Sequence, residues 1–150
     1  MRRTNIMTAL ATGALLAAVA LSTQAQNAQD FGDYVVHYNA LTTDFLTPQV
    51  AKHYGISRSK NRGMLNVSVL SKSMGVPNRS VKAEVSAEAK NLNAQVKPMN
   101  LREISEGNAV YYIAEFPISD RETLDFKIDV TPEGGGGPMS VSFRQQFYTR

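Results

Sequence analysis

The chain has 150 residues, of which 43% are hydrophobic and 19% are charged, a balance typical of a folded domain. Its 16 Lys and Arg residues exceed its 13 Asp and Glu residues by three, but two of the arginines belong to a segment that we expect to be removed. The small remaining excess does not supply the basic face that a nucleic-acid binder needs. The absence of cysteine from the sequence excludes disulfides, thiolate nucleophiles and thiolate-bound metals.

The start of the chain has the three parts of a secretory signal peptide. Two arginines provide the positive start, an apolar run over residues 6–21 follows, and Thr23 and Ala25 are the small residues expected before a cleavage site. The apolar run is shorter than the roughly 20 residues that span a membrane as a helix, so cleavage is favoured over an uncleaved anchor. We therefore predict a signal peptide at residues 1–25, export by the general secretory route to the periplasm, and one mature domain at residues 26–150.

From Phe31 onward, hydrophobic residues recur at every second position, which is the period of a strand with one buried face. The alternation is clearest over Val81–Lys90 and Thr123–Thr131. Weaker candidates are Tyr34–Asn39, Met64–Ser71, Ala94–Arg102, Ala109–Phe116 and Met139–Tyr148. Turn-forming residues separate these segments, so the sequence predicts about seven strands.

A short helix is predicted between the first two of these strands. Thr47 can cap it, Pro48 suits its first turn, and Gly55 can adopt the left-handed conformation that ends it. We expect Val50 and Tyr54 to share its inner face. About seven short antiparallel strands with one short helix are typical of an all-β, immunoglobulin-like β-sandwich, with an up-and-down barrel as the alternative.

Residues that could carry catalysis or hold a metal ion are few and scattered. The two histidines, His37 and His53, have no spacing that forces them together with a third ligand. Ser57–Lys60 matches the S-x-x-K spacing of some serine enzymes, but the partner motifs of those enzymes are absent. The glycine run at residues 134–137 is expected to be a flexible loop between two strands. The sequence therefore predicts no catalytic residue, no metal site and no cofactor.

The densest group of basic side chains lies in one short segment. It runs from Lys52 to Arg62 and includes His53, Arg58 and Lys60. A solvated loop explains such a group, and so does a docking patch for an acidic partner, a phosphate-bearing envelope component or another copy of the chain.

Several segments of the mature chain together resemble one protein family. They are Phe31–Ala40, Asp44–Leu46, Tyr54–Ser59, Leu65–Val69, Ala109–Tyr112 and Phe143–Tyr148. In these segments the chain is similar to DUF4426, a family of small exported proteobacterial proteins known only as a domain of unknown function. The resemblance implies a periplasmic all-β domain and brings no activity, cofactor or catalytic residue. Polar residues of these segments and the basic residues beside them form the candidate binding site: His37, Asn39, Arg58, Ser59, Lys60 and Arg62.

Two functions from different classes are compatible with this pattern. The first is a non-enzymatic periplasmic interaction module that docks an envelope protein or envelope polymer through a strand edge or the basic loop. The second is a small-ligand or metal-ion binding protein, in which the polar face near His37 and Asn39 works with Arg58 as an anion clamp. A small hydrolase comes third. We expect no nucleic-acid partner and no membrane-spanning segment after signal cleavage, and the sequence leaves a homo-oligomer open.

Overall fold

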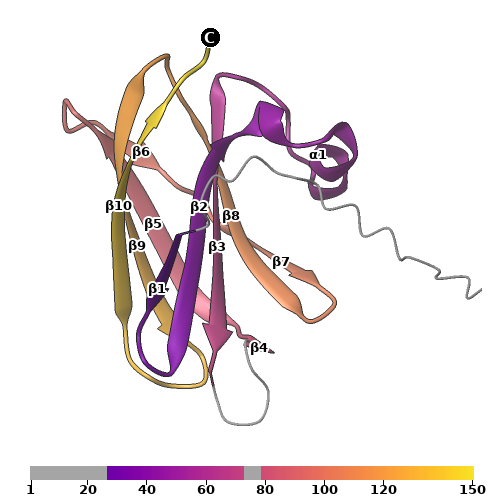
Figure 1. Cartoon of the computed structure of the whole chain (residues 1–150), viewed down its shortest axis with the longest axis vertical. Coiled ribbons are helices and arrows are strands. Elements are labelled where there is room, and N and C mark those ends of the chain that lie inside the picture. The colour runs from indigo at the N-terminus through magenta and orange to yellow at the C-terminus, as the bar shows by residue number, and fades with distance from the viewer. Residues whose placement is uncertain (1–26, 73–78) are drawn as a thin grey trace, which may run out of the picture.

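The computed structural model describes residues 27–72 and 79–150, which form strands joined by loops and short helices (Figure 1). The predicted signal peptide at residues 1–25 lies outside the described residues. In chain order the elements are β1 (Asn27–Asp30), β2 (Tyr34–Thr42), the 3-10 helix η1 (Thr43–Phe45), α1 (Pro48–Tyr54), β3 (Arg62–Ser71), β4 (Arg79–Ser80), β5 (Ala83–Asn91), β6 (Val96–Pro98), β7 (Arg102–Glu106), β8 (Ala109–Pro117), β9 (Glu122–Pro132) and β10 (Met139–Phe147). No helix in this part of the chain is long and apolar enough to cross a membrane.

The strands form two antiparallel sheets that pack against each other. The first sheet has the order β1-β2-β3-β8-β7, with β4 paired to the end of β3, and the second has the order β10-β9-β5-β6. Figure 1 shows the two sheets as layers, with α1 beside one end of the first. The predicted all-β sandwich with one short α-helix is confirmed, and the arrangement in two sheets is not that of an up-and-down barrel.

The alternation of apolar residues places the core between the sheets. In β9, every second residue from Leu124 to Val130 is almost fully buried, and the residues between them are more exposed. In β5, Ala89 is buried and Val85 is half-buried against the same core. The ring of Phe126 stacks on that of Phe143, with 4.6 Å between centroids. The inward faces predicted for these two strands are therefore confirmed.

The predicted strand Ala94–Arg102 is wrong, because the chain changes sheets within it. Val96–Pro98 is β6 of the second sheet, whereas Arg102–Glu106 is β7 of the first. Met99 and Leu101 pack against the core while the chain crosses, so the apolar alternation continues although the sheet does not. This division, together with the short strands β1 and β4, explains why the structure has more strands than the sequence predicts.

The helix α1 begins and ends where the sequence predicts. The Thr47 hydroxyl accepts a hydrogen bond of 3.3 Å from the backbone N–H of Val50, and Gly55 takes a φ of 65°. The predicted inner face is wrong in one position, since Ala51 is buried whereas Val50 is 39% exposed. Tyr54 lies three positions after Ala51, so it shares that inner face as predicted.

The inner face of α1 covers one end of the outer face of the first sheet. Ala51 and Ile56 pack there against Met64 of β3 and Ile113 of β8. This small cluster is separate from the main core between the sheets. The other end of the outer face is not covered by α1, and the candidate site lies there.

Candidate functional site

The first sheet splits where β8 leaves β3. The two strands pair only as far as Val67 opposite Tyr112, and beyond that point β4 pairs with β3 instead, with Ser80 opposite Leu70. The Ser80 hydroxyl accepts a hydrogen bond of 2.9 Å from the backbone N–H of Val110, so a side chain replaces the backbone ladder at the split. The end of the β7–β8 hairpin therefore diverges from β3 and leaves an open trough.

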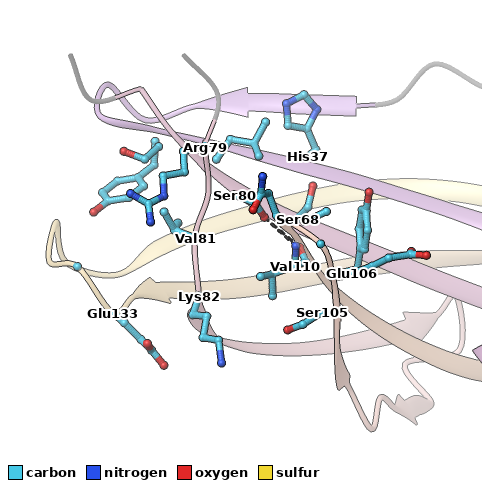
Figure 2. A pocket seen from close by; sticks show the side chains of 18 residues that line it. His37, Ser68, Arg79, Ser80, Val81, Lys82, Ser105, Glu106, Val110 and Glu133 are labelled. Carbon is cyan, nitrogen blue, oxygen red and sulfur yellow. Dashed lines mark hydrogen bonds between the residues drawn. The ribbon is translucent and has the colours of Figure 1, made fainter. Parts of the chain in front are cut away.

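The trough has a volume of about 1500 Å³ and receives side chains from several elements (Figure 2). It is lined by Tyr34, His37, Ser68, Leu70, Ser71, Arg79, Ser80, Val81, Lys82, Ser105, Glu106, Gly107, Asn108, Ala109, Val110, Tyr111, Glu133 and Gly134. Figure 2 shows Arg79, Lys82 and Glu133 toward one end, and His37 and Glu106 toward the other. Cationic, anionic, neutral polar and apolar side chains thus line the same open space.

One basic side chain of the trough has no carboxylate partner in the part of the chain that the structure describes. Within residues 27–72 and 79–150, no carboxylate lies within ion-pair distance of Arg79. The neighbouring Lys82 is engaged, since its ammonium lies 3.2 Å from the Glu103 carboxylate, and this contact raises the pKa of Lys82. Arg79 is therefore a cation of the trough that no described carboxylate engages, and it is available to a ligand.

The carboxylate of Glu106 is held by the helix that covers the sheet. The Tyr54 hydroxyl donates a hydrogen bond to it, and Nε2 of His53 lies 3.4 Å from its other oxygen. The hydrogen bond to Glu106 is the main reason that the pKa of Tyr54 rises to about 12. Arg102 also donates to the backbone carbonyl of Tyr54, so α1 is fixed to the edge strand β7 at the wall of the trough.

Two of the predicted site residues lie on the outer face of β2. His37 lines the trough and pairs across the strands with Ser68. Asn39 follows on the same face, opposite Asn66. Oδ1 of Asn66 is buried without a hydrogen-bond partner among the described residues. The predicted polar face around His37 and Asn39 is thus present beside the trough.

The predicted basic loop lies at the other end of β2. The Arg58 guanidinium donates a hydrogen bond of 2.9 Å to the backbone carbonyl of Asp44, and the N–H of Ser59 donates one of 2.9 Å to the hydroxyl of Thr43. A strand rises about 3.3 Å per residue, so the end of β2 at Thr42 lies roughly 17 Å from His37. The structure therefore does not bring Arg58 and Ser59 together with His37, as the predicted anion clamp would require.

The remaining two predicted residues also lie away from the trough. Arg62 begins β3 and forms an exposed ion pair of 3.4 Å with Glu115. Lys60 lines a second, smaller hollow of about 340 Å³ beside the ends of β2 and β10. In the basic segment, Arg58 thus fixes the loop, whereas Lys60 faces this second hollow.

The comparisons with known proteins give the family. The family model DUF4426, described as a domain of unknown function, matches residues 28–150. The chain belongs to the DUF4426 family. A crystal structure of a DUF4426 family protein from Pseudomonas aeruginosa PAO1, PA0388, is 41% identical to it, with a TM-score of 0.68 over 81% of this chain and 94% of that one. No curated protein matches the chain.

Two further solved structures share the fold of this DUF4426 protein at low identity. One is FetP from uropathogenic Escherichia coli strain F11, expressed recombinantly in the periplasm of E. coli BL21(DE3), at 9% identity and a TM-score of 0.57 over 81% of this chain and 93% of that one. The other is a copper-bound variant of FetP, at 10% identity and a TM-score of 0.56 over 82% of this chain and 95% of that one. At these identities the likeness shows the fold alone. In the described part of this DUF4426 protein, no group of three or more His, Cys, Asp or Glu side chains could hold a metal ion.

The sequence did not identify Arg79 and Ser80 as site residues. Both belong to β4, which has two residues and is too short to produce a detectable alternation. Glu106 lies between two predicted strands, among the turn-forming residues that separate them. Its role depends on contact with His53 and Tyr54, which are distant in the sequence.

Proposed function

We propose that this DUF4426 protein is a non-enzymatic interaction module of the periplasm that docks an extended segment of an envelope protein in the trough. The observation that carries the proposal is the split between β3 and β8, which opens a large trough and presents Arg79 without a carboxylate partner among the described residues. The predicted leader at residues 1–25 supports a periplasmic location, and so does the shared fold of FetP, which was expressed in the periplasm.

The size of the trough favours an extended chain over a compact small molecule. Sites for small molecules commonly enclose about 300–1,000 Å³ and bury most of their ligand. The trough exceeds that range at about 1500 Å³ and is only partly enclosed. An extended peptide can fill such a space and use polar side chains such as Ser68 and Ser105 along it.

The mixture of charges favours a polypeptide over a uniformly anionic polymer. Arg79 attracts an acidic group at one end of the trough, but Glu133 lies at the same end and Glu106 at the other. A chain with a phosphate on every unit would meet these carboxylates and be repelled. A peptide segment can place one acidic side chain at Arg79 and polar or basic groups elsewhere.

The proposal can be tested by site-specific photo-cross-linking in intact cells. A photoreactive amino acid replaces Ser105 in the wall of the trough, and in a matched control it replaces Ser142, which is exposed on the second sheet. We expect one protein to cross-link at position 105 and not at position 142, and Arg79→Glu to reduce that product roughly tenfold. Arg58→Glu is the charge control, because Arg58 lies at the other end of β2. A product that is equally abundant at both positions, or that is insensitive to Arg79→Glu, would refute docking in the trough.

The same purified protein separates this proposal from the alternative of metal binding. Titration with copper, followed by elemental analysis, should leave no stoichiometric metal if the protein acts through the trough alone. Stoichiometric copper would instead favour the metal-binding alternative.

A further inference from the structure

We propose that the second hollow, of about 340 Å³, binds a neutral saccharide ring of an envelope glycan. This site is independent of the trough. It lies at the end of the sandwich where β2 runs into η1 and β10 into the C-terminal residues (Figure 1). Its volume falls within the range of small-molecule sites. Two exposed aromatic rings line it, and hydrogen bonds hold the segments that carry them.

Three aromatic residues line the hollow, and two of them, Phe45 and Tyr148, are unusually exposed, whereas Phe147 is buried. Phe45 is 66% exposed and Tyr148 is 61% exposed, and among the described residues no other aromatic side chain counts among the exposed large hydrophobics. The two residues are far apart in the sequence and yet line the same hollow. An exposed aromatic ring forgoes a large amount of apolar burial, and a group of such rings marks a binding surface.

The ring of Tyr148 is fixed by its polar end. Its hydroxyl donates a hydrogen bond of 2.9 Å to the side chain of Gln146, whose amide donates in turn to the backbone carbonyl of Arg121 at 3.2 Å. The next residue is tied as well, since the N–H of Thr149 donates to the Asp120 carboxylate at 3.0 Å. This hydrogen bond is the main reason that the pKa of Asp120 lies below its usual value. The face of the ring is therefore presented to solvent on a fixed segment.

Phe45 is presented by an equally constrained turn. It ends η1, which begins at Thr43, a residue with no exposed surface. The Thr43 hydroxyl donates to the carbonyl of Ser57 at 2.8 Å and accepts from the N–H of Ser59 at 2.9 Å. Arg58 adds a hydrogen bond to the carbonyl of Asp44. A backbone segment that is held in place before a ligand arrives loses little conformational entropy when its side chains bind that ligand.

The polar groups around the rings favour a neutral ligand with many hydroxyls. Lys60 and Arg150 contribute hydrogen-bond donors to the hollow, and Thr42 and Asp44 contribute acceptors. Arg150 lies 3.5 Å from the Asp120 carboxylate, so the charges of Lys60 and Asp44 balance around the rings and favour neither a cation nor an anion. A saccharide ring has an apolar face of C–H groups that can stack on an aromatic ring, and a rim of hydroxyls that both donate and accept.

The test is saturation-transfer NMR on the purified protein with defined probes. The saccharide probes are chitotetraose and maltotetraose, and choline and benzoate are the cationic and anionic controls. We expect at least one saccharide to receive saturation. Phe45→Ala and Tyr148→Ala should each weaken that binding roughly tenfold. Leu92→Ala is the matched control, because Leu92 is 69% exposed and does not line the hollow.

A further variant tests the proposed fixation of the ring. Tyr148→Phe keeps the ring but removes the hydrogen bond to Gln146, so it should weaken binding less than Tyr148→Ala does. Arg79→Glu should leave saccharide binding unchanged, which separates this site from the trough. The proposal is overturned if no saccharide binds, if only choline or benzoate binds, or if both alanine variants bind as the parent does.

Discussion

Replacing Thr43 by valine removes one buried hydroxyl that organises the loop after β2. Valine has nearly the same shape, so the substitution deletes the hydrogen bonds to Ser57 and Ser59 without opening a large cavity. Each lost bond is worth about 1 to 1.5 kcal/mol, and the N–H of Ser59 is left partly buried without its acceptor. The expected loss of unfolding free energy is therefore about 2 to 3 kcal/mol. At about 2.1 cal/mol/K of unfolding entropy per residue, this lowers Tm by about 10 °C.

Thermal unfolding followed by circular dichroism measures this change, with urea unfolding as an independent estimate of the free energy. Thr43→Ser is the control, because it keeps the hydroxyl and removes one methyl group, at a cost of about 1 kcal/mol. Thr43→Val should therefore be clearly less stable than Thr43→Ser. If the valine variant melts within about 2 °C of the parent, or if the serine variant is the less stable of the two, the hydroxyl does not organise the loop as the structure indicates.

Two further predictions concern the first sheet and its helix. Gly63→Ala should destabilise the fold by about 2 kcal/mol, because the added Cβ would overlap the fully buried ring of Phe116. Urea unfolding measures this loss, and unchanged stability would show that the ring can move aside. The pKa of Tyr54 is raised from 10.0 in its unperturbed state to about 12, so the folded protein holds this proton more tightly than the unfolded chain does. The resulting stabilisation is complete below pH 10 and is lost as the pH rises toward 12, and after allowance for solvent screening it amounts to about 1 kcal/mol. Comparison of the parent with Tyr54→Phe in urea at pH 9 and pH 11.5 should show the parent losing more stability, and equal losses would contradict the hydrogen bond to Glu106.

The strands were predictable where one face is buried along their whole length. β9 shows this directly, because every second side chain from Leu124 to Val130 points into the core. The segment Ala94–Arg102 was not predictable, because Met99 and Leu101 keep contact with the core while the backbone passes from one sheet to the other. Alternation reports which side chains are buried, and does not report which sheet the backbone joins.

The candidate site was predictable only in part. His37 could be placed on a polar strand face from its position between apolar neighbours, and it does line the trough. The position of Arg58 could not be predicted from the sequence, because it depends on η1, where the Thr43 hydroxyl accepts a hydrogen bond from the N–H of Ser59. Arg79 was missed because the split in the sheet is created by a two-residue strand. Features that depend on contacts between distant segments have no local signal in the sequence.

The order of the strands has a consequence for how the chain folds. β3 is central to the first sheet, yet its partner β8 lies far along the chain, since Arg62 pairs with Pro117. The second sheet also pairs segments that are distant in the sequence, because Ala83 of β5 pairs with Pro132 of β9. Pairing of such distant segments requires closure of long loops, and domains dominated by such contacts fold in milliseconds to seconds. During that interval the apolar strand β3 has an open edge to which another unfolded chain can add, so the concentration of unfolded chains should govern how much of the protein aggregates.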